Sequence, residues 1–337
     1  MLVLKYEHII RDIQNNIFSP VYFLSGEEPY YIDSITSLLE DSILDEGLKG
    51  FNQTVIYGRD VSVKEVVDLS RRYPMMGNYQ VVIVKEAQYL NQIENLEQYI
   101  AAPLDTTILI IAYKYKKVDK RKTYYKKMVA SKSTIVFNSE KLRDYSVPNW
   151  IESEIKARGY SISPVALLLM SEYLGNDLGK ISNEIDKLVI NLSEQSNITE
   201  TEIEQNIGIS KDYNLFELQN ALSKKDQLKA HRIIQYFEAN PKDHPLQMIS
   251  VMLHNYFMKI FLYHNIKNKE PNKIASELGV PPFFVKDYIR ASKSFSPIKI
   301  KEIISKIRTL DLKSKGVGNN NATSYGELKE LVYRVMN

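Results

Sequence analysis

The stretch Val21-Tyr-Phe-Leu-Ser-Gly-Glu-Glu-Pro-Tyr-Tyr-Ile-Asp33 has the frame of a nucleotide-binding turn. Its first residues, Val21–Leu24, form a short apolar run typical of a buried strand. Gly26 permits a tight turn after that run, and Pro29 suits the first turn of a following helix. The pattern therefore predicts a strand, a turn and a helix in the order found in phosphate-binding loops.

The chemistry of a phosphate-binding loop is missing from this frame. Such a loop needs a second glycine five positions after the first, then Lys and then Ser or Thr, to cradle phosphates and hold magnesium. Counted from Gly26, those positions hold Tyr31, Ile32 and Asp33. A ring replaces the glycine, no ammonium group reaches a phosphate, and a carboxylate would repel one. We therefore expect an ATPase frame that does not hydrolyse ATP, with no catalytic residue, no cofactor and no metal ion.

The composition limits the classes of function that remain. The 337 residues suffice for two or three domains, and a net charge of +3 does not by itself indicate nucleic-acid binding. The absence of cysteine excludes disulfides, thiol catalysis and cysteine-ligated zinc, and the five histidines are scattered. We find no secretory leader and no apolar stretch of spanning length, so we expect a cytoplasmic protein without a membrane partner.

Up to about residue 140, short apolar runs alternate with helical patterns. The first helix is expected to bury Ile9, Ile10, Ile13 and Ile17 on one face. Strands are expected at residues 21–24, 54–57, 81–84, 106–112 and 134–137. This alternation predicts a parallel sheet covered by helices on both faces.

After about Leu142 the strand signals stop and the periodicity is helical to the C-terminus. Ser163-Pro164 and Asp177 have the residue types of helix starts. Further helices are expected near residues 147–158, 178–192, 215–222, 245–266, 282–293 and 298–312, before a loop at 316–321 and a terminal helix. We expect three domains, at residues 1–141, 142–210 and 211–337.

The stretch Val21-Tyr-Phe-Leu-Ser-Gly-Glu-Glu-Pro-Tyr and several later ones, taken in order, carry a family resemblance. The later stretches are Tyr73-Pro-Met-Met-Gly, Lys117-Val-Asp-Lys-Arg-Lys, Trp150-Ile, Ile162-Ser-Pro, Leu174-Gly-Asn-Asp-Leu, Asn183-Glu-Ile-Asp-Lys-Leu, Gly279-Val-Pro-Pro-Phe-Phe-Val-Lys and Leu310-Asp-Leu-Lys-Ser-Lys-Gly. Across essentially the whole chain they resemble the delta subunit of bacterial DNA polymerase III, a clamp-loader subunit related to AAA+ ATPases. The resemblance implies α/β plus all-α architecture: an AAA+-like parallel-sheet domain, a small helical lid, and a C-terminal helical collar that packs against other loader subunits.

Two further elements of an active AAA+ ATPase are absent. The strand at 81–84 should end in two acidic residues, one holding magnesium and one polarising water, but Lys85-Glu86 stands there. The lid of an active member carries an arginine three residues after the glycine at Gly175, and that position is Leu178. Both departures agree with a non-hydrolysing member.

The loop Arg71-Arg-Tyr-Pro-Met-Met-Gly-Asn78 is the main candidate for function. Pro74 stiffens the turn and Gly77 allows it to reverse, which presents two adjacent apolar side chains. Methionine is flexible and polarizable, and it suits insertion into a pocket on a partner. By resemblance, Met75 and Met76 stand where the family carries an apolar pair, more usually Leu or Phe, that enters a pocket of the sliding clamp. The alternative is that both pack under their own loop.

A second candidate is the basic run Lys114-Tyr-Lys-Lys-Val-Asp-Lys-Arg-Lys-Thr-Tyr-Tyr-Lys-Lys127, with eight basic residues and one acid. Its cations suit phosphates, and its tyrosines are near enough to stack on exposed bases. The candidate DNA-contacting residues are Lys116, Lys117, Lys120, Arg121 and Lys122. The alternative is a solvated helix face.

From the resemblance we expect a subunit of the DNA polymerase III holoenzyme, a nucleotidyltransferase complex, that has no catalysis of its own. It would bind the sliding clamp (beta) and open the ring for loading onto primed DNA. Its other partners would be loader subunits of the gamma/tau and delta-prime types. Two other functions remain open: an active AAA+ ATPase of DNA repair or recombination, and a DNA-binding adaptor that uses the basic run.

Overall fold

A computed structural model describes residues 4–193, 195–210, 212–317 and 325–337. The chain divides into two compact units, with the boundary after Leu142. We call residues 4–142 the N-terminal unit and the described residues from 143 onward the C-terminal unit. The loop expected at residues 316–321 falls mostly outside the described residues.

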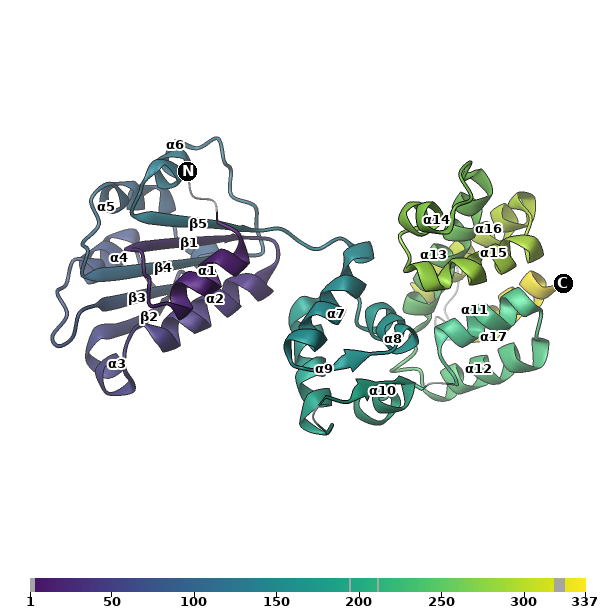
Figure 1. Cartoon of the computed structure of the whole chain (residues 1–337). Helices are drawn as coiled ribbons and strands as arrows, with labels where there is room; N and C mark the ends of the chain where they lie inside the picture. The colour runs from purple at the N-terminus through teal and green to yellow at the C-terminus, as the bar shows by residue number, and fades with distance from the viewer. Residues whose placement is uncertain (1–3, 194, 211, 318–324) are drawn as a thin grey trace. The chain divides into compact units, whose positions relative to one another are not determined.

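A five-stranded sheet forms the centre of the N-terminal unit (Figure 1). Its strands are β1 (Val21–Gly26), β2 (Gln53–Tyr57), β3 (Gln80–Lys85), β4 (Thr107–Lys114) and β5 (Thr134–Ser139). The spatial order is β2-β3-β4-β1-β5, and every neighbouring pair is parallel. Because the chain places β4 and β5 on opposite sides of β1, the carboxyl end of β1 lies at a topological switch point, where parallel sheets bind ligands.

Alternate residues of each strand enter two separate cores, one on each face of the sheet. On one face, Val21 and Phe23 pack with the buried side chains of α4 (Val63–Ser70), α5 (Glu97–Ala101) and α6 (Thr123–Ala130). On the other face, Tyr22 and Leu24 pack with α1 (Tyr6–Gln14) and α2 (Pro29–Ser42), which lie together in Figure 1. The expected parallel sheet with helices on both faces is therefore confirmed.

The first helix is shorter than the sequence pattern predicts. It ends at Gln14, and Asn16 takes the left-handed conformation with φ 57°. Ile17 therefore lies outside the helix and is 60% exposed, so its predicted place on the buried face is wrong. The pattern also gave no sign of α3 (Glu46–Asn52), a short helix that leads directly into β2.

In its described residues, the C-terminal unit is helical apart from one pair of two-residue strands. The strands, β6 (Ser161–Ile162) and β7 (Asn197–Ile198), pair in parallel, so the expectation of no strand after Leu142 is wrong. The helices are α7 (Val147–Ala157), α8 (Pro164–Leu174), α9 (Leu178–Ile190), α10 (Glu200–Ile207), α11 (Leu215–Lys224), α12 (Gln227–Ala239), α13 (Leu246–Asn265), α14 (Pro271–Leu278), α15 (Val285–Ser294), α16 (Pro297–Ser314) and α17 (Tyr325–Met336).

The caps expected at the starts of α8 and α9 are confirmed. The side chain of Ser163 accepts a hydrogen bond from the N–H of Ala166, and that of Asp177 accepts one from Lys180. Each bond satisfies a backbone donor that the first turn of a helix leaves free.

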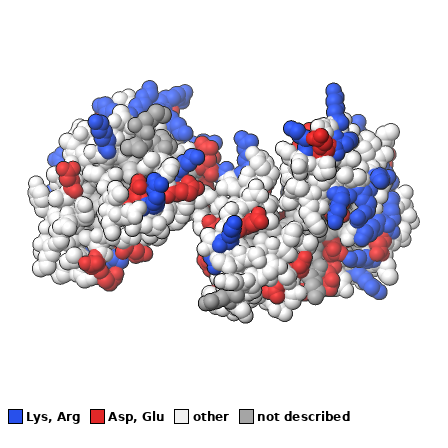
Figure 2. All heavy atoms as spheres, in the orientation of Figure 1, with Lys and Arg blue, Asp and Glu red and all other residues white. Residues whose placement is uncertain are grey.

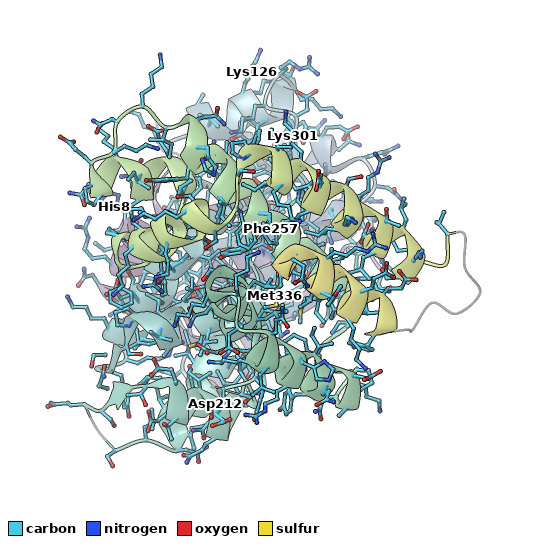
Figure 3. The ribbon with its side chains drawn as sticks, turned by 90° about the vertical axis from the view of Figure 1, so that its right-hand side faces the viewer. His8, Lys126, Asp212, Phe257, Lys301 and Met336 are labelled. Atoms are coloured by element: carbon cyan, nitrogen blue, oxygen red, sulfur yellow. The ribbon has the colours of Figure 1, made fainter. Side chains whose placement is uncertain are left out.

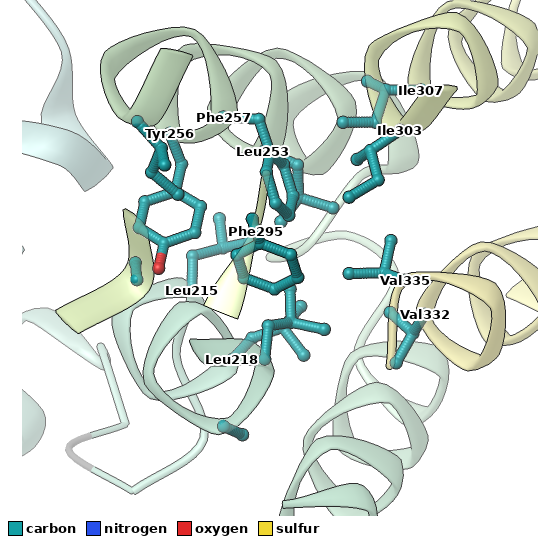
Figure 4. Close-up of a cluster of buried hydrophobic side chains, with 14 of the residues drawn as sticks. Leu215, Leu218, Leu253, Tyr256, Phe257, Phe295, Ile303, Ile307, Val332 and Val335 are labelled. Atoms are coloured by element: carbon teal, nitrogen blue, oxygen red, sulfur yellow. The ribbon is translucent and has the colours of Figure 1, made fainter. Parts of the chain in front are cut away.

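The largest core of the C-terminal unit is built by helices from α11 to α17. Figure 4 shows Phe257 and Phe295 pointing toward one another in its centre, with Leu218 and Val335 beside them. The ring centroids of the two phenylalanines are 5.2 Å apart in an edge-to-face arrangement. The division of this unit into a lid at 142–210 and a collar at 211–337 stays a prediction. Among the described residues, no helix is long and apolar enough to cross a membrane.

Candidate functional site

The turn after β1 is closed by the end of β5. The carbonyl oxygen of Ser139 accepts hydrogen bonds from the backbone N–H groups of Glu27, at 3.0 Å, and Glu28, at 3.4 Å. Gly26 has φ 149°, and a Cβ atom there would lie 1.9 Å from the same oxygen. The backbone donors that would face a phosphate are thus bonded to the chain itself, and only glycine allows this approach.

A carboxylate occupies the N-terminus of α2. The side chain of Glu28 is buried and accepts a hydrogen bond of 3.1 Å from the N–H of Tyr30. An anionic group at this end of a helix is stabilised by the helix dipole, as a bound phosphate would be. The chain therefore supplies its own anion where a nucleotide-binding turn receives one from a ligand.

The three residues at the positions of a phosphate-binding loop are taken up by the fold. Ile32 is fully buried under the sheet, and the ring of Tyr31 packs 4.8 Å from that of Tyr6. Asp33 forms an ion pair of 2.9 Å with Lys114 at the end of β4. This cation, which lies beside the turn, is thereby bonded to a carboxylate of the chain.

The other two residues that differ from an active ATPase, Lys85 and Leu178, also have structural roles in the fold. Lys85, at the end of β3, forms an ion pair of 2.9 Å with Glu40 of α2, and Leu178 is fully buried in the first turn of α9. Within the described residues, no group of three or more His, Asp or Glu side chains is arranged to hold a metal ion. The absence of a metal in the working protein stays a prediction.

The loop between α4 and β3 presents its two methionines to solvent. Met75 is 75% exposed and Met76 is 62% exposed, while Pro74 is half-buried beside them. Gly77 has φ 82°, the left-handed conformation that reverses the chain after the pair. The structure therefore excludes the alternative that both methionines pack under their own loop.

A buried asparagine from α3 holds the backbone of this loop. The Oδ1 atom of Asn52 accepts a hydrogen bond of 2.8 Å from the N–H of Met75, and its Nδ2 atom donates one to the carbonyl oxygen of Met76. Asn52 is fully buried. Sequence reasoning missed it, because one asparagine more than 20 positions before the loop carries no local pattern.

Other residues of α3 extend the support and the apolar surface. Leu48 packs against the core, and its Cδ1 atom lies 3.1 Å from the place where a Cβ on Gly77 would stand. Phe51, next to Asn52 in sequence, is 59% exposed, and Tyr73 of the loop is 72% exposed. The methionine loop, residues 71–78, thus lies beside a second element that exposes an aromatic side chain.

The basic run predicted from the sequence is partly neutralised by neighbouring acids. Lys117 pairs with Glu27, Arg121 pairs with Asp119, and Lys127 pairs with Glu97. The hydrogen bonds from Arg121 lower the pKa of Asp119 to about 2, so that carboxylate stays charged near neutral pH. Figure 2 shows Lys and Arg along the edge of the N-terminal unit near α6.

Four cations of the run form no ion pair with any described residue: Lys116, Lys120, Lys122 and Lys126. The ammonium groups of Lys116 and Lys122 lie over the rings of Tyr89 and Tyr124, at 5.5 and 6.0 Å from the centroids. Lys116, Lys120 and Lys122 therefore remain available to a phosphate, whereas Lys117 and Arg121 are already paired.

Helices α15 and α16 also carry basic side chains that the sequence interpretation did not single out. Six of them have no ion-pair partner among the described residues: Lys286, Lys293, Lys299, Lys301, Lys306 and Arg308. Figure 2 shows Lys and Arg gathered around α15, and Figure 3 shows Lys301 on the outside of α16, away from the buried Phe257. The signal was present as the Lys and Arg content of residues 286–308.

The C-terminal unit also contains a cavity of about 1460 Å³ lined by α8, α11, α13 and α15. Glu172 and Lys259 line it, and the Oε2 atom of Glu172 is buried without a hydrogen-bond partner among the described residues. Burial raises the pKa of Glu172 to about 7, against the opposing effect of Lys259. This carboxyl group therefore titrates near neutral pH.

Comparison with known proteins finds the same family in the N-terminal and in the C-terminal part of the chain. The family model described as DNA polymerase III, delta subunit, matches residues 22–139, and the model for the C-terminal domain of the DNA polymerase III delta subunit matches residues 212–326. The DNA polymerase III subunit delta of Bacillus subtilis (strain 168) is 25% identical over 311 residues, covering 88% of each protein. A probable DNA polymerase III subunit delta of Aquifex aeolicus (strain VF5) is 24% identical over 312 residues, covering 88% of this chain and 86% of that protein.

The fold has a counterpart among solved structures. The Bacillus subtilis DNA clamp loader delta protein superposes with a TM-score of 0.57 at 22% identity, covering 98% of this chain and 99% of that chain. At this level of identity the likeness concerns the fold.

Proposed function

Because the chain belongs to the delta-subunit family of DNA polymerase III, we propose that it binds the sliding clamp through Met75 and Met76 and opens the ring without hydrolysing ATP. The observation that carries this proposal is the exposure of both methionines on a loop whose backbone is held by Asn52. Contiguous apolar surface in water is typical of a site that a partner covers, and the two methionines expose such surface side by side.

The energy available from this loop is sufficient for a specific contact. Burial of both methionine side chains in a pocket contributes about 3–6 kcal/mol before the costs of association. Exposed Tyr73 belongs to the same loop, and exposed Phe51 is the neighbour of Asn52, whose side chain bonds to that loop, so both could enlarge the covered surface. The two methionines are therefore the centre of the proposed interface, and the aromatic residues belong to its edge.

Ring opening needs no bond chemistry in this proposal. A closed ring samples a minor state in which one interface is parted, and a ligand that binds this state more tightly shifts the population toward it. The proposed role of the methionine pair is differential binding to the parted state. ATP would act in other subunits of the loader, where it would expose or withdraw this surface.

The turn after β1 supports the absence of hydrolysis. The Ser139 carbonyl bonds the turn, Glu28 caps α2, and Lys114 is paired with Asp33. A nucleotide would have to break these contacts and displace an anion of the chain before its phosphates could bind. This is the reason for preferring a non-hydrolysing clamp-loader subunit over an active ATPase of repair or recombination.

Other partners follow from the same proposal. The gamma/tau and delta-prime types of loader subunit would pack against residues 211–337, which form the proposed collar. Primed DNA within the loader would meet the unpaired cations Lys116, Lys120 and Lys122. A plain DNA-binding adaptor would use the same cations, but it would leave the exposed methionines without a role. The cytoplasmic location stays a prediction.

A clamp-release experiment tests the ring-opening function. Sliding clamps closed on circular DNA are mixed with excess protein in the absence of ATP, and the clamp that leaves the DNA is measured over time. We expect faster release with the wild type and no acceleration with Met75→Ala/Met76→Ala. The matched control is Ile298→Ala. Ile298 lies in the C-terminal unit and is 74% exposed, so this variant should release the clamp as fast as the wild type does. No acceleration by the wild-type chain would contradict the proposal.

A further inference from the structure

The side chain of Asn52 is the main link between the methionine loop and the body of the N-terminal unit. Among the described residues, no backbone–backbone hydrogen bond holds residues 73–78 outside the bonds of helices and strands. The amide of Asn52 makes two bonds there, to the N–H of Met75 and the carbonyl of Met76. Two further contacts support the loop: Leu48 lies beside Gly77, and the ring of the neighbouring Tyr79 packs 6.0 Å from that of Phe18.

We propose that Asn52 is the positioning residue of the clamp-binding site: it fixes Met75 and Met76 in the exposed, binding-competent conformation before the partner arrives. This inference rests on the proposed function, since it concerns the presentation of the same apolar pair. Asn52 itself is fully buried and so touches no partner. Its effect on binding passes entirely through the loop.

The chemistry of the side chain explains why an asparagine stands at this position. A carboxamide carries an acceptor oxygen and a donor NH2 group on a single short side chain, and the loop offers a matching donor and acceptor on consecutive residues. The amide end of both bonds is buried, so water competes little for the amide. The carboxamide thus restrains the backbone on both sides of the bond that joins the two methionines.

A restrained loop binds more tightly because it loses less freedom on association. An unrestrained loop must be ordered at the moment of binding, which costs affinity for each residue immobilised. Since α3 holds the loop in advance, its short helix is part of the binding apparatus although it does not carry the apolar pair. Loss of the two bonds is expected to weaken clamp binding by about 10-fold.

The test combines clamp affinity with the mobility of the loop. The chain has no cysteine, so Asn78→Cys, at the exposed end of the loop, accepts a single nitroxide label without altering the methionines. In the Asn52→Ala variant we expect about 10-fold weaker clamp binding together with faster motion of the label. The control is Thr36→Ala, which removes a buried hydroxyl that bonds the Ile32 carbonyl at 2.7 Å in α2; it should change neither quantity.

The isosteric variant Asn52→Asp provides a rescue. Its carboxylate keeps the acceptor for the Met75 N–H but has no donor for the Met76 carbonyl, whereas the protonated acid has both. Burial raises the pKa of such a carboxyl group, so clamp affinity and label restraint should approach wild-type values as the pH falls from about 8 to about 6. The wild type should not show this change.

The outcomes separate this inference from the function on which it rests. Unchanged affinity and label motion in folded Asn52→Ala would overturn the positioning role. Weaker binding with unchanged label motion would also overturn it, because the effect would then be a general loss of stability. If Met75→Ala/Met76→Ala binds the clamp as tightly as the wild type, the proposed function fails, while the label still reports whether Asn52 restrains the loop.

Discussion

Lys114 and Asp33 form an ion pair of 2.9 Å that joins the end of β4 to the first turns of α2. Asp33 stands where a phosphate-binding loop has the hydroxyl that holds magnesium, and Lys114 provides a cation beside it. The pair therefore replaces an interaction with a bound nucleotide by one within the chain. Together with the Glu28 cap and the Ser139 carbonyl, it makes the turn a closed structural element.

Restoration of missing residue types should not restore nucleotide binding. In the variant Tyr31→Gly/Asp33→Thr, which leaves the buried Ile32 in place, two consensus residue types return, but the N–H groups of Glu27 and Glu28 remain bonded to Ser139. We expect neither this variant nor the wild type to show ATP-dependent thermal stabilisation or binding of a fluorescent ATP analogue with magnesium. Saturable binding by the wild type would refute the closed turn.

Gly26→Ala should destabilise the N-terminal unit. The new Cβ would lie 1.9 Å from the Ser139 carbonyl oxygen, in a backbone conformation that disfavours side chains. The strands β1 and β5 would have to part at this point, and we expect a loss of about 2–4 kcal/mol in the free energy of unfolding. Urea denaturation provides the measurement.

The control for this substitution is Gly47→Ala, where an added Cβ meets no atom within 4 Å; it should leave the free energy of unfolding nearly unchanged. A neutral Gly26→Ala would show that the turn is not closed as described.

DNA binding should depend on the unpaired cations of the basic run. The triple variant Lys116→Ala/Lys120→Ala/Lys122→Ala removes three charges that have no acidic partner among the described residues. Because each phosphate contact contributes about one unit, we expect the magnitude of the slope of log affinity against log salt concentration to fall by about 2–3. Lys117→Ala/Arg121→Ala should have a smaller effect for each charge, since both cations are already paired. Fluorescence anisotropy with primed DNA gives both slopes.

The unpaired basic side chains of α16 offer a direct comparison with that run. If Lys299→Ala/Lys301→Ala/Lys306→Ala lowers the slope and the triple variant of the basic run does not, the DNA contact belongs to the C-terminal unit instead. That result would contradict the assignment of the DNA contact to the basic run.

Glu172 should make the stability of the C-terminal unit depend on pH. Its pKa is about 7 in the folded chain against 4.5 for the ordinary group, so the folded state binds more protons than the unfolded state between these values. The stability that this carboxyl group contributes is present below pH 4.5 and is lost as the pH rises through 7. Glu172→Gln should therefore raise the free energy of unfolding by about 2 kcal/mol more at about pH 8 than at about pH 5.

Urea denaturation at the two pH values checks the Glu172 prediction. The control is Glu152→Gln, on the exposed face of α7, which should change the free energy of unfolding by the same small amount at both pH values. An equal effect of Glu172→Gln at the lower and the higher pH would show that the buried carboxyl group does not titrate in this range.

The parallel sheet was predictable from the sequence because its strands are continuous apolar runs. Val81–Val84 and Ile108–Ile111 have no polar residue that could face water, which is the pattern of a sheet covered on both sides. The caps Ser163 and Asp177 were equally clear, since their hydrogen bonds are local. In contrast, Ile17 continues the apolar spacing of α1 in the sequence but lies beyond the end of the helix. The left-handed conformation of Asn16 ends the helical path before Ile17, which is therefore exposed.

The site was predictable only where its chemistry is local. The residue types at 31–33 and the apolar pair at 75–76 are visible in the sequence, and the structure shows the pair to be exposed. The Ser139 carbonyl and the amide of Asn52 act on residues more than 20 positions away, and neither carries a motif. The pairing of Lys117 and Arg121 was likewise hidden, because a charge run does not reveal which acids the fold brings near it.

In the proposed function, Met75 and Met76 bind the sliding clamp without the help of nucleotide. The decisive experiment is titration of the clamp from the same organism with the wild-type chain and with Met75→Ala/Met76→Ala, each with and without ATP. We expect tight binding by the wild type that ATP does not change. The folded double variant should lose at least about 100-fold in affinity, because two buried apolar anchors are truncated. Equal clamp affinity of the two proteins, or wild-type binding only in the presence of ATP, would contradict the proposed function.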